Sequence, residues 1–275
     1  MTRLLLAGTS LAAVSACTPE GSRPALSAPA PLPTPAQGST TASSAATPSA
    51  APVPASPAAS APATGPPSSA ATPPARHSLT DPASPWVVVN KHRPLTPATF
   101  VPADLVRPSV RLATSGEAAQ LNSTTAAAAE AMFAAAAAAG VVLTLASGYR
   151  SYTTQIATYN NWVATEGRAA ADTASARPGY SEHQTGWSFD IGDGSGRDSF
   201  TPAFANQPAA VWAKANAHLF GFIVRYPWMF HEITGYYYEP WHLRYVGVEA
   251  AAEMRGRGVA TLEEYLGLEA APGYP

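Results

Sequence analysis

The segment SEHQTGWSFD occupies residues 181–190 and carries the most informative spacing in the sequence. It ends in Asp190, which apolar Phe189 and Ile191 flank. This pattern puts a carboxylate in the middle of an expected strand, where a charge needs a partner because burying it alone is costly. We therefore interpret Asp190 as a metal ligand, although a DIGDG run such as residues 190–194 usually forms a turn.

A second segment, YEPWHLR at residues 238–244, holds Glu239 and His242. Together with His183 and Asp190, His242 completes a set of two imidazoles and one carboxylate. A catalytic zinc needs three protein ligands and one open position for water, and this set meets that requirement. Glu239, three residues before His242, is then free to accept a proton from the metal-activated water as general base.

Each of these residues has a plainer alternative explanation. A single histidine on a strand is more often a satisfied core residue than a ligand. The zinc could also be purely structural, in a wall-binding or signalling module without catalysis. Glu239 separates these readings, because a structural site has no need for a carboxylate beside an open coordination position. The combination therefore predicts an enzyme.

Periodicity and end signals outside these segments predict an α+β fold. We expect helices over residues 123–139, 152–166, 208–219 and 248–255, and another after a capping-box pattern at 261–264. Ser123 is the expected N-cap of the first helix. We expect strands over residues 86–90, 141–146, 222–226 and 236–238. Helices packed on a small antiparallel sheet would then carry the zinc site.

The first residues have the features of a signal peptide. Arg3 gives a positive start, residues 4–13 form an apolar run too short to span a bilayer, and small residues precede Cys17. Cys17 is the only cysteine, so no internal disulfide can form. We interpret residues 1–17 as a lipoprotein-type signal that ends at a lipidated Cys17, which would anchor the protein to the membrane. An ordinary secretory signal is the alternative.

The composition changes near residue 86. Residues 18–85 consist almost entirely of Ala, Pro, Ser, Thr and Gly, and such a segment cannot bury enough apolar surface to offset its ordering entropy. We expect a disordered linker there, either a tether that reaches a polymer held off the membrane or a passive spacer. Residues 86–275 contain regularly spaced aromatic residues and are sufficient for one globular domain.

Charge excludes one class of partner. The chain has 16 Lys+Arg and 18 Asp+Glu, a net charge of −2, with no long basic run. The charge therefore gives no basis for a nucleic-acid-binding surface, and we expect no nucleic-acid partner. We also expect the protein to be a monomer.

The sequence resembles the VanY-type D-alanyl-D-alanine carboxypeptidases from about residue 86 to 267. The resemblance rests on the pattern Ser-x-His-x-x-Gly-x-x-x-Asp followed some fifty residues later by Glu-x-x-His, and on fragments such as SGYRSY at 147–152 and RYP at 225–227. It implies the zinc peptidase fold shared with lysostaphin-like enzymes and the hedgehog signalling domain. It also assigns zinc to His183, Asp190 and His242, and the general base to Glu239.

The same resemblance gives further roles near the zinc. Arg150 would bind substrate and stabilise the oxyanion, since a guanidinium suits both a carboxylate and a developing negative charge. Gln155 and Ser181 would contact substrate, and Tyr226 and Trp241 would form walls of the cleft. Each residue also has a plainer alternative role. Arg150 could form an ion pair at the start of a helix, Gln155 could lie on a helix surface, and Ser181 could form a turn. Tyr226 and Trp241 could be ordinary core aromatics. Four other titratable residues are interpreted as structural: Glu182, Asp193, His218 and His231.

One segment departs from the family pattern. Residues 228–231 read WMFH, where the family commonly has a Gly-Lys-Glu-like turn, so the rim is more aromatic and has lost a lysine. The predicted metal ligands lie outside this segment, but the sequence does not determine which substrates the segment would favour.

The function that the resemblance implies is removal of a terminal D-alanine from peptidoglycan stem peptides, outside the cytoplasm and facing the cell wall. The same motif serves D,D-carboxypeptidases and L,D-carboxypeptidases, and a peptidoglycan endopeptidase is a related alternative. The sequence does not decide among these three bonds.

Overall fold

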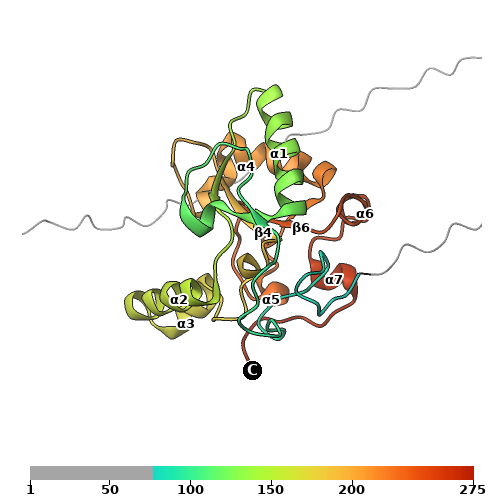
Figure 1. Cartoon of the computed structure of the whole chain (residues 1–275). Coiled ribbons are helices and arrows are strands. Elements are labelled where there is room, and N and C mark those ends of the chain that lie inside the picture. The colour runs from blue at the N-terminus through green and yellow to red at the C-terminus, as the bar shows by residue number, and fades with distance from the viewer. Residues whose placement is uncertain (1–76) are drawn as a thin grey trace, which may run out of the picture. The chain divides into compact units, whose positions relative to one another are not determined.

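The computed structural model describes residues 77–275, so the predicted signal peptide, Cys17 and most of the linker lie outside the described residues. Seven α-helices are described (Figure 1): α1 Ser123–Ala138, α2 Tyr152–Glu166, α3 Arg168–Ala174, α4 Pro208–Asn216, α5 His231–Thr234, α6 Val248–Arg257 and α7 Leu262–Leu266. Six strands accompany them: β1 Leu105–Val106, β2 Leu121–Asn122, β3 Thr144–Ser147, β4 Ser188–Gly192, β5 Phe222–Val224 and β6 His242–Tyr245. Short 3-10 helices cover η1 Gly116–Ala119, η2 Glu182–Thr185, η3 Pro202–Asn206 and η4 Ala217–Phe220.

A four-stranded antiparallel sheet in the order β3-β4-β6-β5 forms the centre of the molecule. Strands β1 and β2 make a separate two-stranded pair. Helix α1 and helix α4 lie together over the sheet, while α2 and α3 pack side by side away from them (Figure 1). The expected α+β fold with a small antiparallel sheet is confirmed.

The two faces of β4 explain why an aspartate sits between apolar residues. Phe189 and Ile191 point into the main core, where Phe189 packs against Phe133 and Phe222 with ring centroids 6.2 and 5.3 Å apart. Successive strand residues point to opposite faces, so Asp190 points away from that core. Its partner in the ladder is His242 on β6, which places both side chains on the same face.

Helix α1 is built almost entirely from alanine around a few larger core residues. Met132 and Phe133 are buried with alanines at helical spacing. The N-cap is Asn122 and not Ser123 as expected: the Asn122 side chain accepts hydrogen bonds from the backbone N–H groups of Thr124 and Thr125, at 3.0 and 3.3 Å. The Ser123 hydroxyl instead donates to Asp104, so a nearby carboxylate displaces it from the cap.

Two expected strands are not strands. Residues 86–90 form an irregular segment that leaves a turn at Trp86 and ends in an isolated bridge between Asn90 and Arg93. Their valines are nevertheless buried, and the Arg244 guanidinium donates to the carbonyls of Pro85 and Val87, so a side chain takes the place of a neighbouring strand. Residues 236–238 form a loop, because their aromatic side chains line a pocket instead of a sheet.

Other element boundaries shift slightly. Strand β5 ends at Val224, two residues earlier than expected, and the helix from Pro208 becomes a 3-10 helix after Asn216. Residues 77–85, assigned to the linker from composition, contact the folded domain: the Trp187 indole donates to the carbonyl of Pro82 at 3.3 Å. Within residues 77–275, no helix combines the length and apolarity needed to cross a bilayer.

Candidate metal centre and active-site pocket

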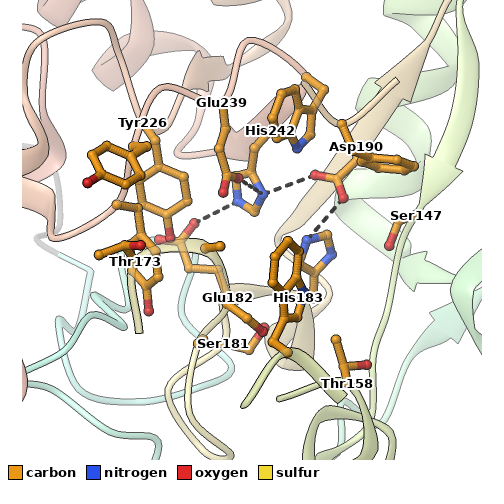
Figure 2. Close-up of a pocket in the computed structure, with 18 of the residues that line it drawn as sticks. Ser147, Thr158, Thr173, Ser181, Glu182, His183, Asp190, Tyr226, Glu239 and His242 are labelled. Atoms are coloured by element: carbon orange, nitrogen blue, oxygen red, sulfur yellow. Dashed lines mark hydrogen bonds and ion pairs between the residues drawn. The ribbon is translucent and has the colours of Figure 1, made fainter. Parts of the chain in front are cut away.

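Three buried side chains from three elements converge at one end of the sheet. His183 lies on η2, Asp190 on β4 and His242 on β6, and one nitrogen or oxygen atom from each lies within 4.8 Å of the others. Nε2 of His183 is 3.4 Å from Oδ2 of Asp190, and Nδ1 of His242 is 3.1 Å from Oδ1 of the same carboxylate (Figure 2). The structure therefore brings the three predicted ligands together.

The outer hydrogen-bond partners of the two imidazoles turn one ring nitrogen of each toward Asp190. Nδ1 of His183 lies 2.7 Å from the carbonyl oxygen of Gly148, to which it can donate, so Nε2 keeps its lone pair. Nε2 of His242 lies 3.4 Å from Oε2 of Glu182, to which it can donate, so Nδ1, 3.1 Å from Oδ1 of Asp190, is the nitrogen that faces the other two side chains. A partner on the far nitrogen is the usual way in which proteins orient a metal-binding histidine. The donor set, two imidazole nitrogens and one carboxylate, fits zinc.

Gly148 is required for the first of these bonds. A Cβ at this position would lie 2.4 Å from the carbonyl oxygen of Gln120 and 2.8 Å from that of Ala118, so no larger residue fits. The glycine lets the end of β3 lie against the segment before α1 and presents its carbonyl to His183. The SGYR fragment thus positions a ligand as well as Arg150.

The carboxylate and the imidazoles perturb one another in the metal-free site. Burial opposes the charge of Asp190, but the charges and hydrogen bonds of His183 and His242 hold its pKa well below its usual range. Burial likewise lowers the pKa of His242, yet hydrogen bonds to Asp190 and Glu182 outweigh it and raise that pKa to about 9. A proton and a metal ion therefore compete for His242 near neutral pH.

Glu239 lies directly beside the ligand set. Its Oε2 is 3.7 Å from Nδ1 of His242, and the side chain lines the pocket. Burial raises the pKa of Glu239 to about 7, and the nearby charge of Asp190 acts in the same direction while His242 opposes it. A dication at the ligand set would lower this pKa. A carboxylate with a pKa near neutrality is suited to accept and return a proton.

A fully buried network of charged side chains contacts His242 through Glu182. Glu182 accepts hydrogen bonds from Arg225 at 2.8 Å and from Arg244 at 2.9 Å, and Arg225 also donates to both oxygens of Glu263 on α7. Burial disfavours the Glu182 charge, but the two guanidinium groups keep its pKa well below its usual range. Glu182 thus stays ionised and can accept a hydrogen bond from Nε2 of His242.

Sequence reasoning classed Glu182 as structural and did not single out Arg225, Arg244 or Glu263. One signal was available: Arg244 lies two residues after His242 on a strand and so shares its face. Arg225 pairs with Glu182 and Glu263 across 43 and 38 residues of sequence, so these pairings leave no local sequence pattern.

The pocket over the ligand set has a volume of about 370 Å³. Arg150, Ser181, Tyr226 and Trp241 line it, as expected for substrate-contacting or wall residues. It is also lined by residues that the sequence did not point to, which are Ser147, Thr158, Trp162, Thr173, Ala174, Ser175, Ala176, Glu182, Phe200, Pro202 and Tyr236–Tyr238. Asp193, His218 and His231 lie outside the lining.

Gln155 differs from its expected position. It is fully buried and does not line the pocket. Its amide oxygen accepts a hydrogen bond from Nη1 of Arg150 at 3.0 Å, and its amide nitrogen donates to the carbonyl of Ala176 at 2.6 Å. Gln155 therefore orients Arg150 and ties the pocket wall to α2, because α2 turns this residue inward.

The aromatic walls contact the ligand set. The Tyr226 ring packs on the His242 ring at 5.0 Å between centroids and on Tyr236 at 4.8 Å. Trp241 packs against Phe200 at 6.1 Å and also belongs to the main core. These rings limit water at the site, which strengthens the electrostatic interactions inside it.

Comparison with known proteins agrees with this geometry. The family model described as VanY: D-alanyl-D-alanine carboxypeptidase matches residues 118–248. The putative carboxypeptidase YodJ of Bacillus subtilis is 40% identical over 190 residues, which cover 68% of this chain and 69% of that protein.

Two solved structures are similar along most of their length. The LdcB LD-carboxypeptidase is 40% identical with a TM-score of 0.64, and the match covers 68% of this chain and 87% of that one. A VanY D,D-pentapeptidase mutant from a VanB-type resistance cassette, in complex with Zn(II), is 36% identical with a TM-score of 0.55, covering 66% of this chain and 97% of that one.

The fold and the three-ligand pocket define a metallopeptidase of the carboxypeptidase class. The chain belongs to the VanY family, whose characterised structures include the Zn(II) complex above. The expected family and enzyme class are confirmed, and the relatives include both D,D- and L,D-specific enzymes.

Proposed function

We propose that this protein is a zinc-dependent carboxypeptidase that removes a terminal D-alanine from peptidoglycan stem peptides. One observation carries the proposal: Nε2 of His183, Nδ1 of His242 and the carboxylate of Asp190 converge in a pocket beside Glu239. In this arrangement His183, Asp190 and His242 hold the zinc. When bound, zinc polarises the scissile carbonyl and makes a water molecule acidic enough to attack it.

Glu239 handles the proton of that reaction. Its carboxylate accepts a proton from the attacking water and returns one to the amine of the leaving D-alanine. Its pocket position and its distance of 3.7 Å from a ligand nitrogen support this role. The backbone N–H of Glu239 donates to the carbonyl of Tyr226 at 3.0 Å, so this hydrogen bond holds the Glu239 backbone next to Tyr226 of the pocket wall.

Arg150 supplies the recognition of a free C-terminus. Among the described residues no carboxylate forms an ion pair with it, and Gln155 and Ser147 accept hydrogen bonds from its guanidinium. Arg150 lines the pocket, and the donors of its guanidinium that are not used in these bonds can bind a substrate carboxylate or a developing oxyanion. Ser181, buried in the same wall, is the hydroxyl that we assign to the same carboxylate.

The D,D bond of the pentapeptide is our first candidate, since the family model is that of D-alanyl-D-alanine carboxypeptidases. The LdcB neighbour, an LD-carboxypeptidase, favours the L,D bond of the tetrapeptide as a second candidate. One experiment distinguishes them: incubate the zinc-loaded full chain with pentapeptide and tetrapeptide stems and identify the products by mass spectrometry. Loss of D-alanine from neither stem would overturn the proposal.

Recognition of the C-terminus is tested with the same peptides amidated at their ends. A carboxypeptidase that uses Arg150 cuts the free acid far faster than the amide, and Arg150→Lys damages the acid reaction because a point charge lacks the planar fork. Equal rates for acid and amide would instead indicate an endopeptidase.

We further propose that the enzyme works outside the cytoplasm and is anchored by lipidated Cys17. The apolar run before this lone cysteine, and a substrate in the cell wall, support the assignment. Cys17→Ser should move the protein from the membrane fraction to the soluble fraction. Unchanged membrane association of that variant would argue against lipidation.

A further inference from the structure

Exposed aromatic side chains gather at the mouth of the pocket. In the part of the chain that the structure describes, the aromatic residues among the exposed large apolar side chains are Trp162, Phe200, Trp228 and Tyr237, at 39%, 53%, 63% and 58% exposure. Trp162, Phe200 and Tyr237 line the pocket. Trp228 packs edge-on against pocket-lining Tyr238 with ring centroids 5.7 Å apart. We call these four residues the aromatic rim.

The rest of the described surface is different. Its exposed large apolar side chains are aliphatic ones such as Val101, Val211 and Leu219, together with Met229 beside the rim. Aromatic exposure at one place, contributed by four separate segments, is not what scattered surface residues would produce. Clustered exposed apolar side chains around a cleft mark a binding surface.

Backbone strain accompanies two of the rim positions. Phe200 itself has φ +57°, and Met229, next to Trp228, has φ +70°. Both lie in the left-handed region, which costs a residue with a side chain about 1–2 kcal/mol. Such conformations persist mainly where they present a functional group. Here they lie in the two loops that carry Phe200 and Trp228, and Asp198 in the first of these loops also has a positive φ, +56°.

The rim is electrically neutral. Every charged or titratable acidic or basic residue in the pocket lining belongs to the site already described: Arg150, Glu182, His183, Asp190, Glu239 and His242. A partner that crosses the rim therefore meets flat, uncharged rings, with His231 packed beside Tyr237 at 5.8 Å between ring centroids. Sugar rings suit such a surface, because their hydroxyl groups lie at the edge while their faces present C–H groups that gain from leaving water.

Resting on the function proposed above, we infer that the aromatic rim binds the sugar rings of the glycan strand to which the stem peptide is attached. A stem of four or five residues reaches about 13–18 Å when extended. With its C-terminal end at the ligand set, its other end leaves the pocket across the rim, and the first sugar follows there. The enzyme would then recognise a stem on its glycan in preference to the stem alone.

Two matched substrates test this inference: a stem peptide, and the same peptide carrying an N-acetylated disaccharide. The wild-type full chain should show about tenfold higher kcat/KM for the glycosylated substrate, the amount expected of one or two ring contacts. Trp228→Ala should reduce this ratio at least threefold, mainly through KM, and Trp228→Phe should restore most of it. Leu219→Ala, an exposed apolar position outside the pocket lining, should leave the ratio at the wild-type value.

The outcomes are separable. If wild type cuts both substrates with equal kcat/KM, the inference is overturned while the proposed function stands. If neither substrate is cut, the proposed function fails, and a binding measurement still decides the rim. Peptide-free oligosaccharide of the same N-acetylated sugars should quench tryptophan fluorescence saturably, and Trp228→Ala should weaken that binding. Absence of saturable binding to the wild-type chain would also overturn the inference.

Discussion

Glu239 and His242 are neighbours with opposite requirements for a proton. Glu239 must be ionised to accept a proton, whereas His242 must lose its proton before Nδ1 can hold a metal ion. Without a metal ion, burial and the negative charge of Asp190 raise the pKa of Glu239, and a hydrogen bond to Asp190 raises the pKa of His242. A zinc ion would reverse these effects, so metal loading prepares the base as well as the ligand set.

Replacement of the base separates catalysis from metal binding. Glu239→Gln keeps the shape of the side chain but removes the proton acceptor, so kcat should fall by about 10²- to 10⁴-fold while one zinc stays bound. Glu232→Gln is the matched control, because Glu232 is an exposed carboxylate outside the pocket lining. The rate of stem-peptide hydrolysis and the zinc content should be measured for both variants. Near-full turnover by Glu239→Gln would exclude Glu239 as the base.

Replacement of a ligand should remove metal and activity together. His183→Ala leaves one imidazole and one carboxylate, too few for a stable zinc site. His218→Ala serves as the control, since His218 is partly exposed and outside the pocket. The zinc content of the purified variants is the measurement, and stoichiometric zinc in His183→Ala would contradict the ligand assignment.

At the scale of elements, one network of buried charges fastens several segments. Arg225 follows β5, Arg244 lies on β6, Glu182 begins η2 and Glu263 lies on α7. Asn90 adds a hydrogen bond to Glu263 at 3.0 Å and brings in the segment that follows the linker. The network thus couples the docking of α7 to the orientation of His242 through Glu182.

Breaking this network should be costly. Glu263→Gln leaves the buried Arg225 only partly compensated, and removal of one partner of a buried pair typically costs about 3–5 kcal/mol of unfolding free energy. Glu249→Gln, at an exposed position on α6, is the control. Chemical denaturation at neutral pH is the measurement. A loss below about 1 kcal/mol would mean that the pair contributes no more than a surface ion pair.

The same variant has a predictable pH dependence. Burial opposes the Glu263 charge, but Arg225 holds its pKa below the ordinary value of 4.5. A carboxylate with a depressed folded-state pKa contributes stability above its unfolded value, and that stability is lost as the pH falls through the folded pKa. The difference in stability between wild type and Glu263→Gln should therefore be constant above about pH 5 and shrink below pH 4.5.

At the scale of the whole molecule, the proposed zinc site joins three elements from distant parts of the chain. The ligands come from η2, β4 and β6, so the unfolded chain cannot offer the same site. A ligand that binds only the folded state stabilises it by about 2.7 kcal/mol at 100 times its Kd. Zinc should therefore raise Tm, and a chelator should lower it.

The size of this shift should depend on pH. The pKa of His242 is raised to about 9 in the metal-free protein, so at lower pH zinc must displace a proton from it. The zinc-induced rise in Tm should be larger at pH 8 than at pH 6.5, and about one proton should be released per zinc at neutral pH. Calorimetry in two buffers of different ionisation enthalpy measures that proton. A pH-independent zinc affinity would contradict the raised pKa of His242.

Local patterns alone predicted the ligand types, the base and most helices of this protein. His183, Asp190, Glu239 and His242 stand in segments whose spacing and apolar context are local properties, and helices such as α2 begin and end at local signals. The sequence also predicted an α+β fold with a small antiparallel sheet. The roles of these side chains in catalysis stay predictions until the variants above are measured.

Only the tertiary structure decided the support and surroundings of the site. Glu182, Arg225 and Glu263 find one another across long stretches of sequence, so no local periodicity encodes their pairing. Gln155 is buried because α2 packs against α3, and it binds Arg150 there. Residues 86–90 form no strand, and the Arg244 guanidinium donates a hydrogen bond to the carbonyl of Val87 in this segment. Such features depend on which distant groups arrive at the same place, and burial then makes their pairing obligatory because an unpaired buried charge is too costly.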